Sequence, residues 1–197
     1  MHPALIRHRE RSGSRAAVRG FTLIELLVTM TIAAIVLAIG VPNLRNVVSD
    51  QRVRATASDL SSEIAFTRAN AVASGRRTVF EPLVAGNWTQ GWRIYTDVDG
   101  SNTFNAGDVE LKRSNPLTGT LKICTNVAEF ANNVIFRPDG SVVRTSAATA
   151  NDGITVSDDM GNAAVSDDKI RTLYFGPSGR ITVVQQNGGT NGGVACP

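Results

Sequence analysis

GFTLIELLVTMTIAAIVLAIGV, residues 20–41, is the stretch of this 197-residue chain that decides its fold. From Phe21 to Val41 the only charged residue is Glu25, and the other polar side chains are threonines. A helix over these residues is about 31 Å long, which matches the hydrocarbon core of a bilayer. Residues 21–42 are therefore predicted to form a transmembrane helix.

Positive charge is concentrated ahead of this apolar run. Residues 1–20 contain five arginines and one glutamate, a net charge of +4, whereas the whole chain carries +3. This basic flank predicts that the N-terminus stays cytoplasmic and that the chain after Pro42 lies on the far side of the membrane. Both histidines, His2 and His8, also lie in the flank, so its removal leaves no imidazole for catalysis. We therefore do not expect an enzyme.

Two kinds of processing fit a basic start followed by an apolar run. A secretory signal peptide needs small residues at a cleavage site after the run. Here VPNLRNVVSDQR follows at residues 41–52, whereas the small residue Gly20 stands before the run. The sequence favours cleavage between Gly20 and Phe21, which retains the apolar helix.

The junction Gly20-Phe21-Thr22-Leu23-Ile24-Glu25 resembles that of the type IV prepilins, which are cut between Gly and Phe and carry glutamate as the fifth mature residue. The resemblance implies that residues 1–20 are a leader peptide removed by prepilin peptidase and that Phe21 is N-methylated. It also implies a single-pass protein of the bacterial inner membrane, with a periplasmic head, that assembles into a filament.

Glu25 has two interpretations. An ionised carboxylate at bilayer depth costs at least ~2.5 kcal/mol unless a partner is supplied. The freed amine of Phe21 on a neighbouring subunit is one such partner, so the pair would set axial register during assembly. In the alternative, Glu25 lies near the headgroups and is merely tolerated. The flanking motif favours the assembly role.

A second helical segment is predicted over residues 43–75, with a kink at Pro42. Apolar residues recur there at helical spacing: Val53, Ala57, Leu60, Ile64 and Ala71. The charged residues Arg52, Asp59, Glu63 and Arg68 are expected to face elsewhere. Ser74-Gly75 is a suitable helix end. This amphipathic helix is predicted to be half-buried against a globular head.

Residues 76–186 are predicted to form a β-rich head. We expect strands at 77–84, 91–97, 109–114, 120–126, 133–137, 141–145, 153–157, 170–176 and 180–186. Pro138-Asp139-Gly140 and Gly176-Pro177-Ser178-Gly179 predict two hairpin turns, and the glycine-rich residues 187–197 predict a flexible tail. The expected fold class is α+β, a long N-terminal helix packed on an antiparallel β-sheet or β-sandwich head, as in pilins.

Motifs in the β-rich head indicate which group of prepilins the chain resembles. The order of Gly75-Arg76-Arg77, Gly91-Trp92-Arg93, Phe136-Arg137-Pro138-Asp139-Gly140 and Ser178-Gly179-Arg180 resembles the GspH/FimT pseudopilins and minor pilins. The resemblance implies a minor pilin that enters or primes a type IV pilus, with other minor and major pilins or pseudopilins as partners. Two alternatives remain, a DNA-binding minor pilin for natural transformation and a type II secretion pseudopilin. Trp88 and Trp92 are expected to fill the base of the β-domain.

The two cysteines, Cys124 and Cys196, both follow the apolar run and so lie in an oxidising compartment. A disulfide between them would close a loop of about 70 residues and stabilise the head by roughly 4 kcal/mol. The alternative is one buried and one free thiol.

A loop at residues 97–110 contains Asp97, Asp99 and Asp108, whose oxygens alternate as calcium ligands do. The match to an EF-hand loop is partial, because Asn102 stands at the sixth position and Asp108 at the twelfth. Such residues also form hairpin loops without a metal. Calcium is therefore a weak candidate, and no other cofactor is expected.

Arginines in the hairpins offer a DNA-binding hypothesis. FimT-like proteins that take up DNA carry a Gly-Arg-x-Arg motif, and this chain has Gly179-Arg180-Ile181-Thr182, which lacks the second arginine. A phosphate-binding cluster would need Arg180 to be joined by others. The candidates are Arg171, Lys169, Arg144 and Arg137. The alternative is dispersed, solvated arginines.

Overall fold

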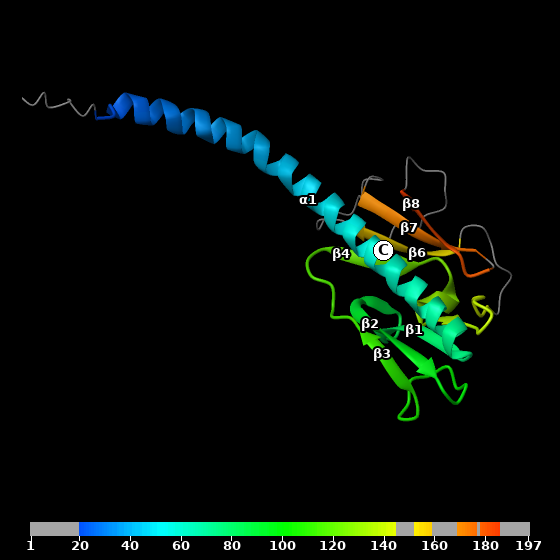
Figure 1. Cartoon of the computed structure of the whole chain (residues 1–197). Helices are drawn as coiled ribbons and strands as arrows, with labels where there is room; N and C mark the ends of the chain where they lie inside the picture. Colours follow the sequence, from blue (N-terminus) through cyan, green and yellow to red (C-terminus); the bar gives the residue numbers. More distant parts are fainter. Residues whose placement is uncertain (1–19, 145–151, 159–168, 177, 186–197) are drawn as a thin grey trace, which may run out of the picture. The chain divides into compact units, whose positions relative to one another are not determined.

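A computed structural model of the protein describes residues 20–144, 152–158, 169–176 and 178–185. The chain forms two compact units, residues 1–43 and 44–197, and each is described by itself. The helix α1 (Leu23–Ser74) runs from the first unit into the second (Figure 1). The expected long helix is thus confirmed, and it continues through Pro42. The kink at Pro42 stays a prediction.

In the second unit, α1 ends where the sequence predicted. Ser74 is its last residue, and Gly75 follows with φ of +64°, the left-handed conformation that glycine adopts at low cost. All five residues of the predicted apolar stripe are at most 1% exposed. They place one face of residues 44–74 in the core of the head.

The prediction was wrong for two of the four charged residues expected to face away. Glu63 is 8% exposed, and Arg68 is half-buried. Both side chains have polar partners in the head. Burial of their methylene groups therefore does not leave a charge without a partner.

Within the residues that the structure describes, eight strands make two antiparallel four-stranded sheets (Figure 1). The first sheet has the order β3-β2-β1-β5, and the second has the order β4-β6-β7-β8. The strands are β1 (Arg77–Val84), β2 (Asn87–Asp97), β3 (Val109–Arg113), β4 (Leu121–Thr125), β5 (Val134–Phe136), β6 (Gly153–Asp158), β7 (Ile170–Phe175) and β8 (Ile181–Gln185). A short 3-10 helix, η1 (Ala128–Ala131), follows β4. The expected α+β architecture is therefore confirmed.

Two strand predictions need correction. The strand expected at 91–97 begins at Asn87, because Gly91 lies in the middle of β2 rather than at its start. At Gly91 φ is +89°, and a Cβ would lie 2.6 Å from the Ser114 carbonyl oxygen, so the glycine admits a neighbouring backbone. The strand expected at 141–145 is only a bridge between Val142 and Phe136, and Thr145 lies outside the described residues.

The larger of two buried apolar clusters joins α1 to both sheets. It contains the helical stripe together with Phe80 and Ile94 from the first sheet and Ile154 and Leu173 from the second. Trp88 and Trp92 are 1% and 3% exposed and pack on Phe80, as expected for residues that fill a β-domain. The head is therefore a single packed body that holds residues 44–74 on its surface.

Candidate assembly site

The first unit begins with a capped helix. Thr22 Oγ1 accepts a hydrogen bond from the Glu25 backbone N–H at 3.2 Å, and the Thr22 carbonyl accepts one from Leu26 N–H. This is the N-cap arrangement of a Thr-x-x-Glu sequence. Thr22 was not among the predicted site residues, although the Thr-x-x-Glu spacing is a signal for a helix start. The cap fixes where the helix starts, two residues after Phe21.

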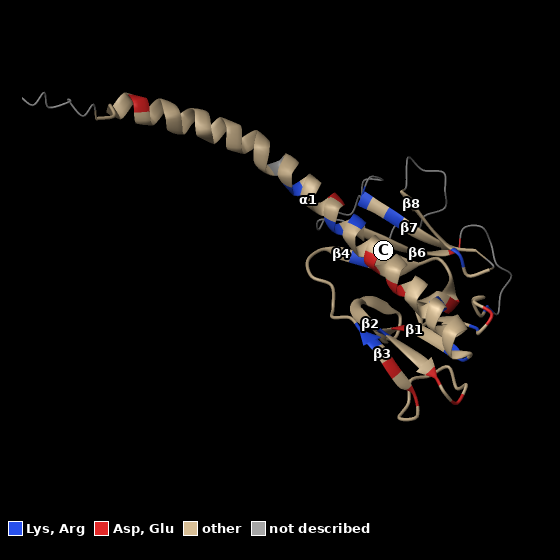
Figure 2. Cartoon of the chain, in the orientation of Figure 1, with Lys and Arg blue, Asp and Glu red and all other residues tan. Residues whose placement is uncertain are grey.

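Apolar side chains cover the helix that follows. Phe21 and Leu23 are each 84% exposed, and the exposed apolar side chains continue to Val41. An 18-residue window of α1 has a mean hydropathy of 2.4, and none of it is buried. Glu25 is the only charged residue of α1 before Arg45, and Figure 2 shows a single acidic position near the start of this otherwise uncharged stretch. The segment needs lipid or other apolar helices around it.

Glu63 joins α1 to the first sheet. Its carboxylate accepts a short hydrogen bond from Trp92 Nε1 and forms an ion pair of 2.6 Å with Lys112 Nζ. Burial of Trp92 requires an acceptor for the indole N–H, and Glu63 supplies it. Trp92 is on β2 and Lys112 on β3, so one helical side chain engages two strands.

Asp50 and Ser49 join α1 to the second sheet. The Asp50 carboxylate lies 3.0 Å from Arg171 on β7 and 2.8 Å from Arg54, one helical turn away. Ser49 donates a hydrogen bond of 2.8 Å to the buried Asp158 on β6. These contacts fix the start of the head-bound part of α1.

Arg68 joins the two predicted hairpin turns. Its Nε donates to the Gly140 carbonyl at 2.9 Å, and its Nη2 donates to the Ser178 carbonyl at 3.3 Å. Gly140 and Gly179 have φ of +80° and +75°, and a Cβ on Gly179 would overlap the Gly140 carbonyl oxygen. The two turns therefore touch at a point held by a helical guanidinium.

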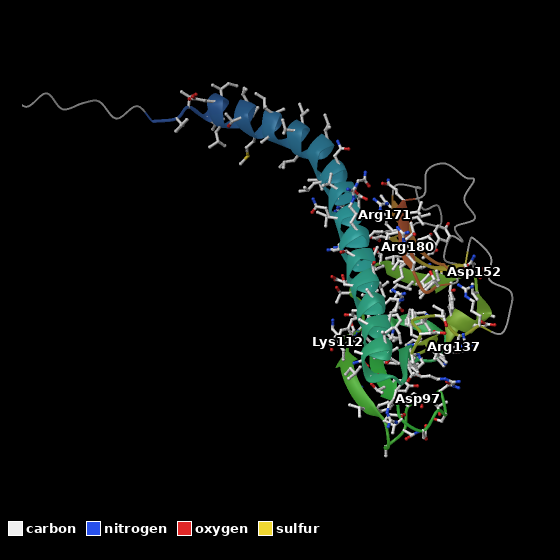
Figure 3. The ribbon with its side chains drawn as sticks, turned by 45° about the vertical axis from the view of Figure 1, so that its right-hand side comes forward. Asp97, Lys112, Arg137, Asp152, Arg171 and Arg180 are labelled. Carbon is white, nitrogen blue, oxygen red and sulfur yellow. The ribbon has the colours of Figure 1, made fainter. Side chains whose placement is uncertain are left out.

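The arginines proposed for DNA binding have different environments (Figure 3). Arg144 is buried in an ion pair with Asp152, and Arg171 is buried beside Asp50. Arg137 donates to Ser141 Oγ and the Val142 carbonyl. Lys169 donates to Asn46. Arg180 alone of the five is exposed without a described partner. The predicted residues thus do not form one open basic cluster.

The aspartates of the 97–110 loop do come together. Oxygens of Asp97, Asp99 and Asp108 all lie within 4.8 Å of one another. Asp97 accepts hydrogen bonds from Gly100 N–H and Asn102 N–H, and Asp108 accepts them from Val98 N–H and Asn105 N–H.

The third carboxylate, Asp99, accepts a backbone hydrogen bond from Ser101 and a side-chain bond from Asn105. The bonds from Ser101 are the main reason that the pKa of Asp99 is lowered to about 2. These N–H donors account for the loop conformation, and calcium binding stays a prediction.

The structure describes only one of the two cysteines that are predicted to form a disulfide. Cys124 lies in β4 and is partly buried, whereas Cys196 lies outside the described residues. Residues 1–19 of the predicted leader and the tail at 187–197 also lie outside them. The pairing of the two cysteines stays a prediction.

Comparison with known proteins agrees with this geometry. The family described as Type II transport protein GspH matches residues 56–167, and the prokaryotic N-terminal methylation motif matches residues 15–41. A comparison with curated proteins gave no match.

Solved structures of two proteins also match this chain. The type IV minor pilin FimU of Pseudomonas aeruginosa is 19% identical with a TM-score of 0.50, over 68% of this chain and 89% of that one. The minor pseudopilin EpsH from the Type 2 Secretion System of Vibrio cholerae is 13% identical with a TM-score of 0.44, over 68% and 96%. The GspH match spans more than half of the chain and the methylation motif covers the capped apolar helix, so this protein belongs to the family described as Type II transport protein GspH.

Proposed function

We propose that this protein is a minor pilin that enters or primes a type IV pilus after prepilin peptidase cleaves between Gly20 and Phe21. The observation that carries the proposal is the capped, fully exposed apolar helix with a single carboxylate at Glu25. Such a surface is suited to lie first in the inner membrane and then among equivalent helices of other subunits. The head would then be periplasmic.

Glu25 would direct assembly by pairing with the amine of Phe21 on a neighbouring subunit. In an apolar surrounding this carboxylate needs a cation, and cleavage at Gly20 creates one at the end of each helix. The N-cap at Thr22 holds Glu25 in the first helical turn, close to that end. A solved structure that matches this chain is named a type IV minor pilin, and we expect a structural role for this chain too.

The test is to produce the full chain with prepilin peptidase and its sibling subunits, and to analyse the filament fraction by mass spectrometry. We expect the mature chain to begin at N-methylated Phe21. Glu25→Ala should reduce incorporation into filaments about tenfold, whereas Thr31→Ala, which removes another polar group of the same helix, should not. An N-terminus that retains Arg19 or lies beyond Val41, or full incorporation of Glu25→Ala, would contradict the proposal.

A type II secretion pseudopilin is the second candidate, because the matching family carries that description. Both roles use the same membrane segment, so co-purification distinguishes them. Pilus subunits in the purified complex support the first role, and type II secretion subunits support the second.

DNA binding is a narrower hypothesis, since only Arg180 of the predicted cluster is exposed without a described partner. Salt-sensitive binding of duplex DNA that is lost in Arg180→Ala would support it. Equal binding by the variant, or no binding, would exclude this form of it.

A further inference from the structure

The last strand of the second sheet has an open edge. β8 pairs with β7 on one side, and no described strand pairs with its other side. The backbone of Arg180 faces β7, because its carbonyl accepts a hydrogen bond of 2.8 Å from Gly176 N–H. Two residues later Thr182, opposite Tyr174, faces β7 in the same way. Since an antiparallel ladder alternates, the N–H and C=O groups of Ile181, Val183 and Gln185 point to the open edge.

A groove separates this edge from α1. One part, about 690 Å³, is lined by α1 residues that include Ser61, Ala65 and Ala69, with Ile181 opposite them. A second part, about 340 Å³, shares Ser61 and has Val183 on the strand side. Small helical side chains therefore leave room beside β8 for the side chains of one more strand.

Arginines line both ends of the groove. At one end the exposed Arg54 pairs with Asp50, which also binds the buried Arg171. At the other end Arg68 is bonded to neutral carbonyl groups and Arg180 is exposed. The acid that lines this second end is Asp139. An occupant with carboxylate side chains would complement the exposed guanidinium groups of Arg54 and Arg180.

We propose that the groove receives an extended, acidic segment of a different pilin-like subunit, which pairs with β8 and continues the second sheet beyond it. The open backbone groups provide the pairing, and the arginines select the carboxylates. A segment of about five residues would match the length of β8. This inference rests on the proposed assembly function and names the head contact by which a neighbour is chosen.

Photocrosslinking in cells that produce the full chain and its sibling subunits tests the contact. A benzophenone amino acid at position 183 should crosslink to an acidic segment of another subunit, identified by peptide mass spectrometry. The same group at Thr182, which points to the other face of the sheet, should not. A third probe at Ile32, in the apolar helix, should crosslink to sibling helices if the proposed function holds.

The crosslinks at positions 183 and 32 distinguish failure of the head contact from failure of the proposed function. Crosslinks at 32 without one at 183, or a crosslink from 183 to a second copy of this chain, would overturn the inference and leave the proposed function standing. No crosslink at either position would count against both. Val183→Pro, which removes an outward N–H at an edge where proline is tolerated, should lower co-purification about fivefold to tenfold. Thr182→Ala, at a position whose N–H faces β7 and whose side chain lies on the other face of the sheet, should not.

Discussion

Glu63 shows how a single residue can depart from its sequence pattern. Helical spacing indicates which face of α1 is apolar, but Glu63 lies three residues after Leu60, at the border of that face. Whether such a residue turns inward depends on a partner elsewhere in the chain, here Trp92. A buried indole must donate its N–H, yet the sequence alone does not show which acceptor it meets.

Removal of this acceptor should destabilise the head. We expect Glu63→Ala to lower the free energy of unfolding by about 2–3 kcal/mol, because the buried Trp92 N–H loses its partner. Asp59→Ala, on the exposed face of the same helix, should change it by less than about 0.5 kcal/mol. Chemical unfolding of the full chain in detergent, followed by tryptophan fluorescence, measures both. Equal stability of the two variants would contradict this role.

Asp99 gives a prediction for pH. Its pKa is lowered to about 2 in the folded loop from an ordinary value of 3.8, chiefly by hydrogen bonds from Ser101. A lowered carboxyl pKa stabilises the loop above the ordinary value, and this contribution is lost as the pH falls through about 2. An NMR titration of the full chain in detergent should therefore show the Asp99 carboxyl midpoint near 2. A midpoint near 3.8 would mean that the bonds are absent in solution.

At the scale of elements, the turns were the most predictable parts of the head. Turns can be predicted from local residue types, as at Pro138-Asp139-Gly140 and Gly176-Pro177-Ser178-Gly179. The strand limits at Gly91 and at 141–145 were not predictable, because they depend on a neighbouring backbone and on sheet pairing. The contact between the two turns through Arg68 also joins residues far apart in sequence.

The contact between the turns predicts unequal effects of the same substitution. Gly179→Ala should lower the free energy of unfolding by about 3 kcal/mol or more. The added methyl group would overlap the Gly140 carbonyl oxygen, and alanine would be strained at this positive φ. Gly86→Ala, with φ of +74° and nothing within 4 Å, should cost about 1 kcal/mol. Unfolding curves of the two variants test this difference. Similar losses would argue against the close approach.

For the whole molecule, the long apolar N-terminal helix, the α+β class and the apolar stripe followed from composition and periodicity alone. The arrangement of two sheets around one core did not, because strand order depends on long-range packing. The DNA-binding cluster failed for a similar reason. Sequence shows that Arg144 and Arg171 are cationic, but only the fold shows that Asp152 and Asp50 already pair with them.

The disulfide predicted between Cys124 and Cys196 would link β4 to the end of the chain. If it forms, mass spectrometry of unreduced peptides will find the two residues linked. Reduction should then lower the stability of the head by roughly 4 kcal/mol, because the unfolded chain regains the freedom of a loop of about 70 residues. Two free thiols in the head, or unchanged stability after reduction, would contradict the prediction.

The junction at Arg68 has a mechanical consequence. Within the head, α1 contacts the first sheet through Glu63, the second through Asp50, and a turn from each through Arg68. Tension along residues 44–74 would consequently be shared by both sheets instead of peeling one hairpin at a time. A head built in this way is suited to a filament that is pulled.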